Sequence, residues 1–126
     1  MFKKTKKGRL KKFEFKTNKL IFGNLGLKAI ESGIINSRQI EAARQAISKK
    51  TKKKAKIWIK IFFNLPITTK PTSIRMGKGK GQISDLSVRV NSGSVLIEIC
   101  GTNKNVLIEA LKAGKAKLAL KTKIFN

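Results

Sequence analysis

Residues 36–63 read NSRQIEAARQAISKKTKKKAKIWIKIFF, and the hydrophobic period changes within this stretch. Apolar residues first recur at helical spacing: Ile40, Ala43 and Ile47. Further along they alternate, as on the buried face of a strand: Ile57, Ile59, Ile61 and Phe63. Asn36 is a favourable N-cap, and Gln39 stands three residues later, as in a capping box. The stretch predicts a helix, a lysine-rich connection and a strand.

Glycine and proline mark the neighbouring segments. Residues 13–30 favour extended structure, with bends or bulges expected at Gly23 and Gly26. A turn-prone stretch is expected between Pro66 and Pro71.

The C-terminal half predicts a β-hairpin and a second helix. Residues 83–90 and 94–100 form the expected hairpin around 91–93, where Asn and Gly tolerate a positive φ. Asn103 is the expected cap of a helix over residues 104–115. Four apolar side chains should face inward: Val106, Leu107, Ala110 and Leu111. Together the elements predict an α+β fold, an α/β sandwich in which a mostly antiparallel sheet carries two helices on one side.

The chain length and the basic start define the expected domain organisation. The 126 residues favour a single domain. Residues 1–12 are too polar and basic to pack alone. We therefore expect a basic N-terminal arm over residues 1–12 and one α+β domain over residues 13–126.

Positive charge sets this sequence apart. It holds 30 Lys and Arg against 6 Asp and Glu, with a net charge of +24 and no His. The cations gather in four almost acid-free blocks: residues 3–19, 49–60, 70–80 and 112–123. A charge run is often just a solvated face, but four such blocks exceed what solubility requires. The pattern favours nucleic acid as the partner over an anionic membrane or an acidic protein.

Residues 75–81 read RMGKGKG and are the clearest candidate for contact with phosphate. Glycine at alternate positions removes each Cβ that would hold the backbone off a ligand, while Arg75, Lys78 and Lys80 supply cations. The spacing matches neither a Walker loop nor a dinucleotide-binding fingerprint. Taken alone, the loop also fits a flexible, solvated turn.

The outer face of the expected strand alternates cations with aromatic rings: Lys56, Trp58, Lys60 and Phe62. Such rings can stack on RNA bases while the amines meet phosphates. For Trp58 we favour the other interpretation, in which the ring packs beneath a neighbouring loop or helix. The arginine face of the first helix could likewise be only solvated.

The same inventory argues against catalysis and against a bound metal or cofactor. With no His or Tyr and six scattered acids, no acid–base pair or activated nucleophile is evident. Cys100 stands alone, so neither an internal disulfide nor a cysteine-rich zinc site is expected. The longest apolar run, near residues 57–67, is broken by Lys60 and Asn64 and is too short to span a membrane. We expect a protein that is not an enzyme.

Five motifs occur in order along nearly the whole chain: GLKA at 26–29, RQIEAAR at 38–44, KIWI at 56–59, KP at 70–71 and RMGKGKG at 75–81. In this order and spacing they resemble the bacterial and organellar family of ribosomal protein sixteen of the large subunit. The tail agrees, with Glu98, Gly101, Glu109-Ala110 and Lys117-Leu118. The chain departs from the family at Asp85-Leu86-Ser87, where aromatic residues are usual, and at Ala119, where proline is usual.

The resemblance implies a structural constituent of the large ribosomal subunit that binds its rRNA below the central protuberance. It implies that the loop over residues 75–81 reaches toward the A-site transfer RNA and the peptidyl transferase centre, and helps to position that transfer RNA during translation. The basic arm would thread into rRNA. The expected partners are large-subunit rRNA, A-site transfer RNA and neighbouring ribosomal proteins, with no membrane span and no homo-oligomer.

The candidate RNA contacts come from the arm, the first helix, the lysine-rich connection, the outer strand face and the glycine loop. They are Lys3, Lys4, Lys6, Lys7, Arg9, Arg38, Arg44, Lys52, Lys53, Lys54, Lys56, Lys60, Lys70, Arg75, Met76, Gly77, Lys78, Gly79, Lys80 and Gly81. No catalytic or metal-binding residue is expected.

Composition also bears on the compartment. Lysine outnumbers arginine 25 to 5, and Ile, Asn and Phe are frequent, as expected from an A/T-rich genome. The arm that resembles the family's starts almost at Met1, so we expect no import presequence. We therefore expect a mitochondrion that encodes its own copy, with a plastid or an A/T-rich bacterium left open.

A free basic protein that coats DNA or an anionic surface is the alternative function. Such a coat would need a repeated or amphipathic cationic element, whereas these charges occupy an arm and separate irregular loops. Sedimentation of a lysate in moderate salt distinguishes the two, because a ribosomal protein migrates with large subunits and a coat protein with the nucleoid or membrane.

Overall fold

A computed structural model of the protein describes residues 20–63, 65–69, 77 and 79–126. Some of the candidate contacts lie outside these residues. They are the five candidate contacts of the arm, Lys3, Lys4, Lys6, Lys7 and Arg9, together with Lys70, Arg75, Met76 and Lys78. The path and domain boundary expected for residues 1–12 lie outside them as well.

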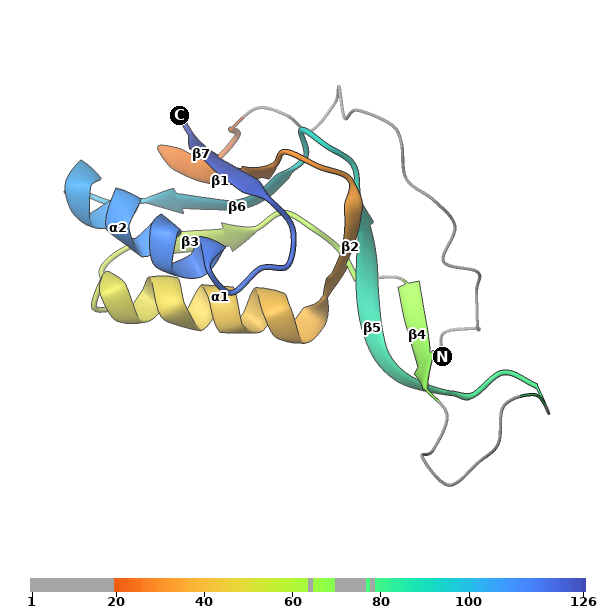
Figure 1. The fold of residues 1–126 in the computed structure, drawn as a ribbon. Coiled ribbons are helices and arrows are strands. Elements are labelled where there is room, and N and C mark those ends of the chain that lie inside the picture. Colours follow the sequence, from red (N-terminus) through yellow and green to blue (C-terminus); the bar gives the residue numbers. More distant parts are fainter. Residues whose placement is uncertain (1–19, 64, 70–76, 78) are drawn as a thin grey trace.

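Two antiparallel sheets and two helices make up the described part of the chain (Figure 1). The larger sheet has the strand order β3-β6-β1-β7, with bounds Lys56–Ile59, Val95–Cys100, Leu25–Ala29 and Thr122–Phe125. The smaller has the order β2-β5-β4, with bounds Gly33–Asn36, Gln82–Val90 and Leu65–Thr69. The helices α1 (Ser37–Lys50) and α2 (Lys104–Lys115) lie along one side of the larger sheet. The predicted α+β class is confirmed, with two sheets where one was expected.

Both helices begin where their caps predict. The Asn36 side chain accepts a hydrogen bond from the Arg38 N–H at 3.1 Å, and Gln39 accepts one from the Asn36 N–H at 3.1 Å, which completes the capping box. The expected stripe of α1 is buried: Ile40, Ala43 and Ile47. Asn103 caps α2 in the same way, by accepting a hydrogen bond from the Asn105 N–H at 3.1 Å.

One side chain of α2 was placed wrongly by the sequence. Leu107, Ala110 and Leu111 are buried as expected, but Val106 is 37% exposed. At 100° per residue Val106 lies about a quarter turn from the centre of the buried stripe, in the first turn of the helix. A single apolar residue at the edge of a stripe carries no signal of its own about burial.

The expected hairpin between residues 83–90 and 94–100 is wrong. Strand β5 pairs with β2 and β4, whereas β6 pairs with β1 and β3, so the turn carries the chain from one sheet to the other. Gly93 has the expected positive φ of 90°. Its N–H donates to the Ala29 carbonyl at 2.6 Å, and the Ala29 N–H donates to Ser94. Contacts with β1 therefore hold this turn, and no local signal could have identified them.

The strands also differ from expectation elsewhere. The stretch after Pro66 forms the edge strand β4 rather than a turn, because an edge position tolerates the missing N–H of proline. Strands β2 and β7 were not predicted. The irregularity in β1 lies between Leu27 and Lys28, not at Gly26. Gly26 instead permits close packing, since a Cβ there would lie 2.9 Å from the Ile97 carbonyl oxygen.

Strand β3 is shorter and less buried than its alternating pattern predicts. It ends at Ile59 and pairs only with β6, at the edge of the larger sheet. Ile59 is partly exposed, while Ile57, Ile61 and Phe63 pack against the core without being fully buried. An edge strand has a neighbour on one side only, so its apolar face is covered incompletely.

Two apolar residues of α2 should contribute differently to the free energy of unfolding, because one lies in the core between the helices and the larger sheet and the other lies at its edge. Replacing Leu111, which is fully buried, by alanine should lower the free energy of unfolding by about 2–5 kcal/mol. Val106→Ala should change it by about 0.5 kcal/mol or less, because the side chain lies at the edge of the stripe. Equilibrium unfolding of the free protein in urea measures both. Equal losses from the two variants would contradict the burial described for α2.

Candidate nucleic-acid interface

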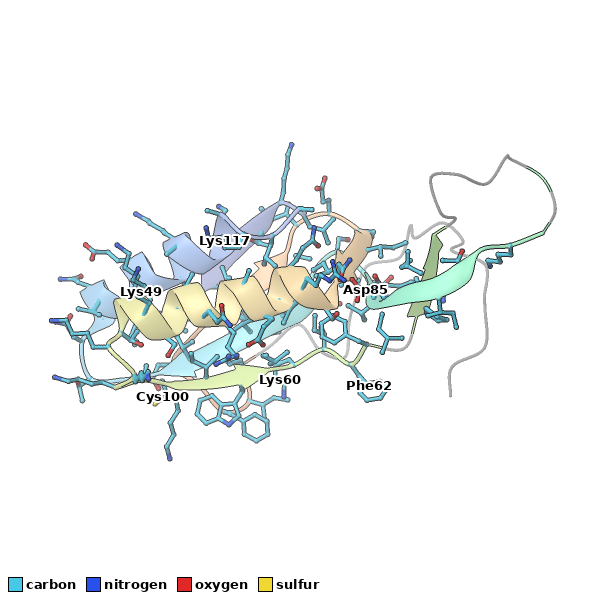
Figure 2. All side chains as sticks on the ribbon, turned by 90° about the horizontal axis from the view of Figure 1, so that it is seen from below. Lys49, Lys60, Phe62, Asp85, Cys100 and Lys117 are labelled. Atoms are coloured by element: carbon cyan, nitrogen blue, oxygen red, sulfur yellow. The ribbon has the colours of Figure 1, made fainter. Side chains whose placement is uncertain are left out.

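The candidate contacts that the structure describes fall into separate regions of the molecule. One region is the segment after α1, here called the helix-end lysines: Lys52, Lys53, Lys54 and Lys56. A second is the glycine loop, residues 75–81, which precedes β5, and the remaining described candidates are Arg38 and Arg44 on α1 and Lys60 directly after β3. Figure 2 shows Lys49 near one end of α1 and Asp85 near the other, and residues 79–81 of the glycine loop lie beyond Asp85 at the start of β5. The structure therefore does not gather these cations into one patch.

The described part of the glycine loop has a backbone that requires glycine. Gly77 has a φ of 95° and Gly79 a φ of 89°, values that residues with a Cβ rarely adopt. A Cβ at either position would meet no described atom within 4 Å. Gly77, Gly79 and Lys80 are exposed, and Gly81 is half-buried. Conformation, rather than crowding inside the described protein, explains these two glycines, and no described atom occupies the space where their Cβ would be.

The helix-end lysines begin with a Schellman motif at the end of α1. The Lys52 N–H donates to the Lys49 carbonyl at 3.3 Å, and the Lys53 N–H donates to Ser48 at 3.0 Å. The buried Thr51 hydroxyl adds a hydrogen bond to Ile47 at 3.0 Å. These bonds satisfy carbonyl groups that the end of a helix otherwise leaves without partners.

Lysine occupies positions in this motif where glycine is the usual residue. Lys52 has a φ of 53° and Lys53 a φ of 61°, both in the left-handed region. A residue with a Cβ is strained there by roughly 1–2 kcal/mol. Both side chains are exposed, so burial does not compensate the backbone strain at either residue. The chain thus keeps two cations at a place where glycine would be less strained.

A hollow of about 320 Å³ lies beside the helix-end lysines. Its wall comes from the end of α1 and the segment after it, and from the start of α2. The lining residues are Lys50, Thr51, Lys52, Lys54, Ala55, Gly101, Thr102, Asn103, Val106 and Leu107. Three of them are lysines from one side, so positive charge is concentrated around the hollow.

Asp85 lies on β5, the strand that follows the glycine loop, and its carboxylate connects this strand to the start of α1. The Ser37 hydroxyl donates to its carboxylate at 3.0 Å, the Leu86 N–H donates to it at 2.8 Å, and the Arg38 guanidinium lies 3.3 Å away. Burial alone would raise the pKa of Asp85, but these neighbours and the Asn36 side chain hold it below its ordinary value. Ionised Asp85 therefore braces β5 against α1, at a position where related sequences are expected to carry aromatic residues.

The candidate arginines of α1 both pair with acids. Arg38 pairs with Asp85, although its own side chain is mostly exposed. Arg44 pairs with Glu41 through two of its nitrogens, with Nε 3.1 Å from Oε2 and Nη2 bonded to Oε1. The hydrogen bonds and charge of this exposed pair lower the pKa of Glu41 and raise that of Arg44. A contact with RNA would have to share or replace these partners.

Lys60 and Trp58 have partners within the protein as well. The Lys60 Nζ lies 3.6 Å from Oε2 of the buried Glu98 and 4.2 Å from the centre of the Phe22 ring. The Phe22 ring stacks on Trp58, with ring centres 5.8 Å apart. The expectation that Trp58 packs beneath a neighbouring segment is confirmed. Phe62, by contrast, extends into solvent (Figure 2).

Sequence reasoning missed the structural roles of the two acids that matter most to this geometry, Asp85 and Glu98. Glu98 is the lone acid within the otherwise apolar run of β6, a pattern that could have indicated a buried charge with dedicated partners. Asp85 carries no comparable local signal, since its partners on α1 are 48 residues away in sequence.

The described ranges contain no group of three His, Cys, Asp or Glu side chains that could hold a metal ion. Among the same residues, no helix has the length and apolar character needed to cross a membrane.

Comparison with known proteins finds similarity along nearly the whole chain. The family model of ribosomal protein L16p/L10e matches residues 1–125. Large ribosomal subunit protein uL16 of Bartonella quintana is 47% identical over 125 residues, covering 99% of this chain and 91% of that protein. Its counterpart from Bartonella henselae is 46% identical with the same coverage. The uL16 protein of Sinorhizobium fredii is 43% identical over 122 residues, covering 97% of this chain and 89% of that protein.

The strained lysines predict an unusual effect on stability. Lys52→Gly should raise the free energy of unfolding by about 0.5–1 kcal/mol, because relief of left-handed strain outweighs the extra freedom of glycine in the unfolded chain. Lys54→Gly removes the same charge from a residue without a positive φ, so it should be neutral or destabilising. Urea unfolding compares the two. A loss of stability for Lys52→Gly as large as that for Lys54→Gly would contradict the strain argument.

Proposed function

The chain belongs to the ribosomal protein L16p/L10e family and is a structural constituent of the large ribosomal subunit, and on this premise we propose that it binds the rRNA of that subunit below the central protuberance. We further propose that its glycine loop helps to position A-site transfer RNA near the peptidyl transferase centre. It acts as a scaffold and not as an enzyme.

The glycine loop is the observation that carries the proposal for transfer RNA. Gly77 and Gly79 hold a positive φ with open space on the side where a Cβ would be, so the backbone there can approach a nucleic acid closely. Three cations are interleaved with the glycines: Arg75, Lys78 and Lys80. Backbone N–H groups and cations together suit phosphate, and they do so without reading sequence.

The arm and the helix-end lysines have a different proposed role. The arm carries five candidate cations within residues 3–9, and two of the helix-end lysines, Lys52 and Lys54, line a hollow at the opposite end of α1 from Asp85. Sequence-independent contacts of this kind supply affinity and orientation. We assign them to the incorporation of the protein into the subunit, and the glycine loop to the work of the finished subunit.

The proposal includes a compartment, a mitochondrion that encodes its own copy. The excess of lysine over arginine, 25 to 5, supports an A/T-rich genome. The relatives compared above come from bacteria. The genome that carries the gene, together with its genetic code, decides between an organelle and an A/T-rich bacterium.

Neutralising the glycine loop should separate function from incorporation. Replacing Arg75, Lys78 and Lys80 together by alanine should leave the amount of protein in purified large subunits near normal, because the core is untouched. The same subunits should accommodate A-site transfer RNA and form peptide bonds more slowly, by roughly tenfold, since charge-assisted contacts with phosphate are lost. Quantitation of the protein in subunits, transfer-RNA binding and single-turnover peptide-bond rates measure this.

Gly79→Val tests the backbone with every cation retained. A β-branched residue is strained at a φ of 89°, so this variant should also impair transfer-RNA accommodation while entering subunits normally. The matched control replaces Lys52, Lys53 and Lys54 by alanine, which removes three cations from the other region and should mainly reduce incorporation. Loop variants that are lost from subunits as badly as this control, or that work at full rate, would refute the role assigned to the loop.

A further inference from the structure

A fully buried glutamate holds the segment through which the basic arm joins the domain. Among the acids that the structure describes, only Glu98 is completely buried, in the middle of the larger sheet. Its Oε1 accepts hydrogen bonds from three consecutive backbone N–H groups, those of Ile21, Phe22 and Gly23, at 2.7, 3.0 and 3.1 Å. These donors are 75 to 77 residues from Glu98 in sequence.

The second carboxylate oxygen completes the contact through a cation. Oε2 is buried without a hydrogen-bond partner and lies 3.6 Å from the Lys60 Nζ. Lys60 in turn lies over the Phe22 ring, which stacks on Trp58. One acid thus binds both the backbone of this segment and the cation beneath its aromatic ring.

The charge of Glu98 persists at neutral pH because of these partners. Burial alone would raise its pKa, but the N–H groups of Gly23, Ile21 and Phe22 and the Lys60 charge hold the pKa below its ordinary value. An ionised carboxylate accepts such bonds about twice as strongly as a neutral group does. The contact is therefore a charged clamp rather than an incidental hydrogen bond.

Hydrophobic burial contributes little to holding this segment. Ile21 is 65% exposed and Phe22 is 56% exposed, and neither belongs to a helix or a strand. Gly23 allows the close approach, since a Cβ there would lie 2.5 Å from the Ile99 carbonyl oxygen. The clamp and the glycine together explain why the segment lies against β6.

We propose that Glu98 is a positioning residue for RNA binding, which clamps residues 21–23 to the larger sheet and so fixes the place and direction from which the basic arm extends to rRNA. The inference rests on the proposed function, in which the arm contacts rRNA. Nine cations lie within residues 3–19, directly before the clamped segment. Because residues 21–23 are fixed, less conformational entropy is lost when the preceding cations bind RNA. Glu98 would therefore raise the affinity without contacting the RNA itself.

The sign of the effect distinguishes the clamp from simple electrostatics. Glu98→Gln keeps the size of the side chain and removes one negative charge, so charge alone would tighten binding to RNA. The clamp predicts the reverse, a loss of affinity for a large-subunit rRNA fragment of roughly tenfold. Glu109→Gln is the matched control, because it makes the same charge change at an exposed acid on α2 and should leave affinity unchanged or slightly higher.

The test repeats Glu98→Gln in a full-length chain whose seven arm cations are replaced by glutamine: Lys3, Lys4, Lys6, Lys7, Arg9, Lys11 and Lys12. If Glu98 acts through the arm, the substitution should change affinity by less than about twofold in this background. An equal loss in both backgrounds, or no loss in the native one, overturns the inference while leaving the proposed function intact. An arm-neutralised chain that binds as tightly as the parent refutes the proposed arm contact, and the inference falls with it.

A second variant keeps the test decisive should Glu98→Gln fail to fold. Gly23→Ala leaves the carboxylate and the core side chains in place but displaces the segment from Ile99. It should show the same arm-dependent loss of RNA affinity, and faster amide exchange of the Ile21 and Phe22 N–H groups than in the parent. Unchanged exchange and affinity would contradict the clamp.

Discussion

Mutual repulsion among the cations is the constraint on which this structure depends. The chain carries 30 cations against 6 acids, and no Lys or Arg side chain is buried in the described ranges whose burial is defined. The core is aliphatic, and the one completely buried charge in that part of the chain is the negative charge of Glu98. A small domain with such a field is stabilised by a polyanion, so the same charge that weakens the free protein favours its place on RNA.

The ends of the secondary structure carry the charge that the core excludes. At the end of α1, two lysines occupy left-handed positions that glycine would occupy with less strain. Before β5, glycines occupy left-handed positions in open space, interleaved with cations. The lysines after α1 expose positively charged side chains at a cost in stability. The glycines before β5 have no side chain and therefore expose the backbone. Strained or open backbone thus occurs at the two places where RNA contact is proposed, while the rest of the described domain is well packed. This is expected when function, rather than folding, determines the residues at those two places.

Local patterns predicted the parts of the fold that depend on neighbouring residues. The capping box of α1, the N-cap of α2 and the apolar stripes of both helices predicted these elements, because N-caps and helical periodicity act within a few positions of the chain. The turn at Gly93 was located correctly, but its partner strand was not, since the choice between β5 and β1 is made by packing across the molecule. Strands β2 and β7 are four residues each, too short to show a period.

The sequence predicted which cations and glycines form the candidate interface, but not which residues hold them in place. Cation blocks and the RMGKGKG motif are visible in the sequence. The family resemblance predicted a structural constituent of the large ribosomal subunit, and the comparisons confirm that assignment. The structural roles of Asp85 and Glu98 were not predicted, because Ser37 lies 48 residues from Asp85 and the backbone donors to Glu98 lie 75 to 77 residues away. These acids oppose the overall charge, and each joins two segments that are far apart in sequence: Asp85 joins β5 to the start of α1, and Glu98 joins β6 to residues 21–23.

The salt dependence of binding to large-subunit rRNA tests most directly the claim that charge fits this protein to RNA. If 6 to 10 of the cations meet phosphates, affinity should fall roughly a thousandfold or more between about 50 and 200 mM salt. A titration of the intact protein against its rRNA fragment across that range measures the slope. A nearly flat response would contradict the account, because shape or apolar contacts would then hold the protein on the RNA.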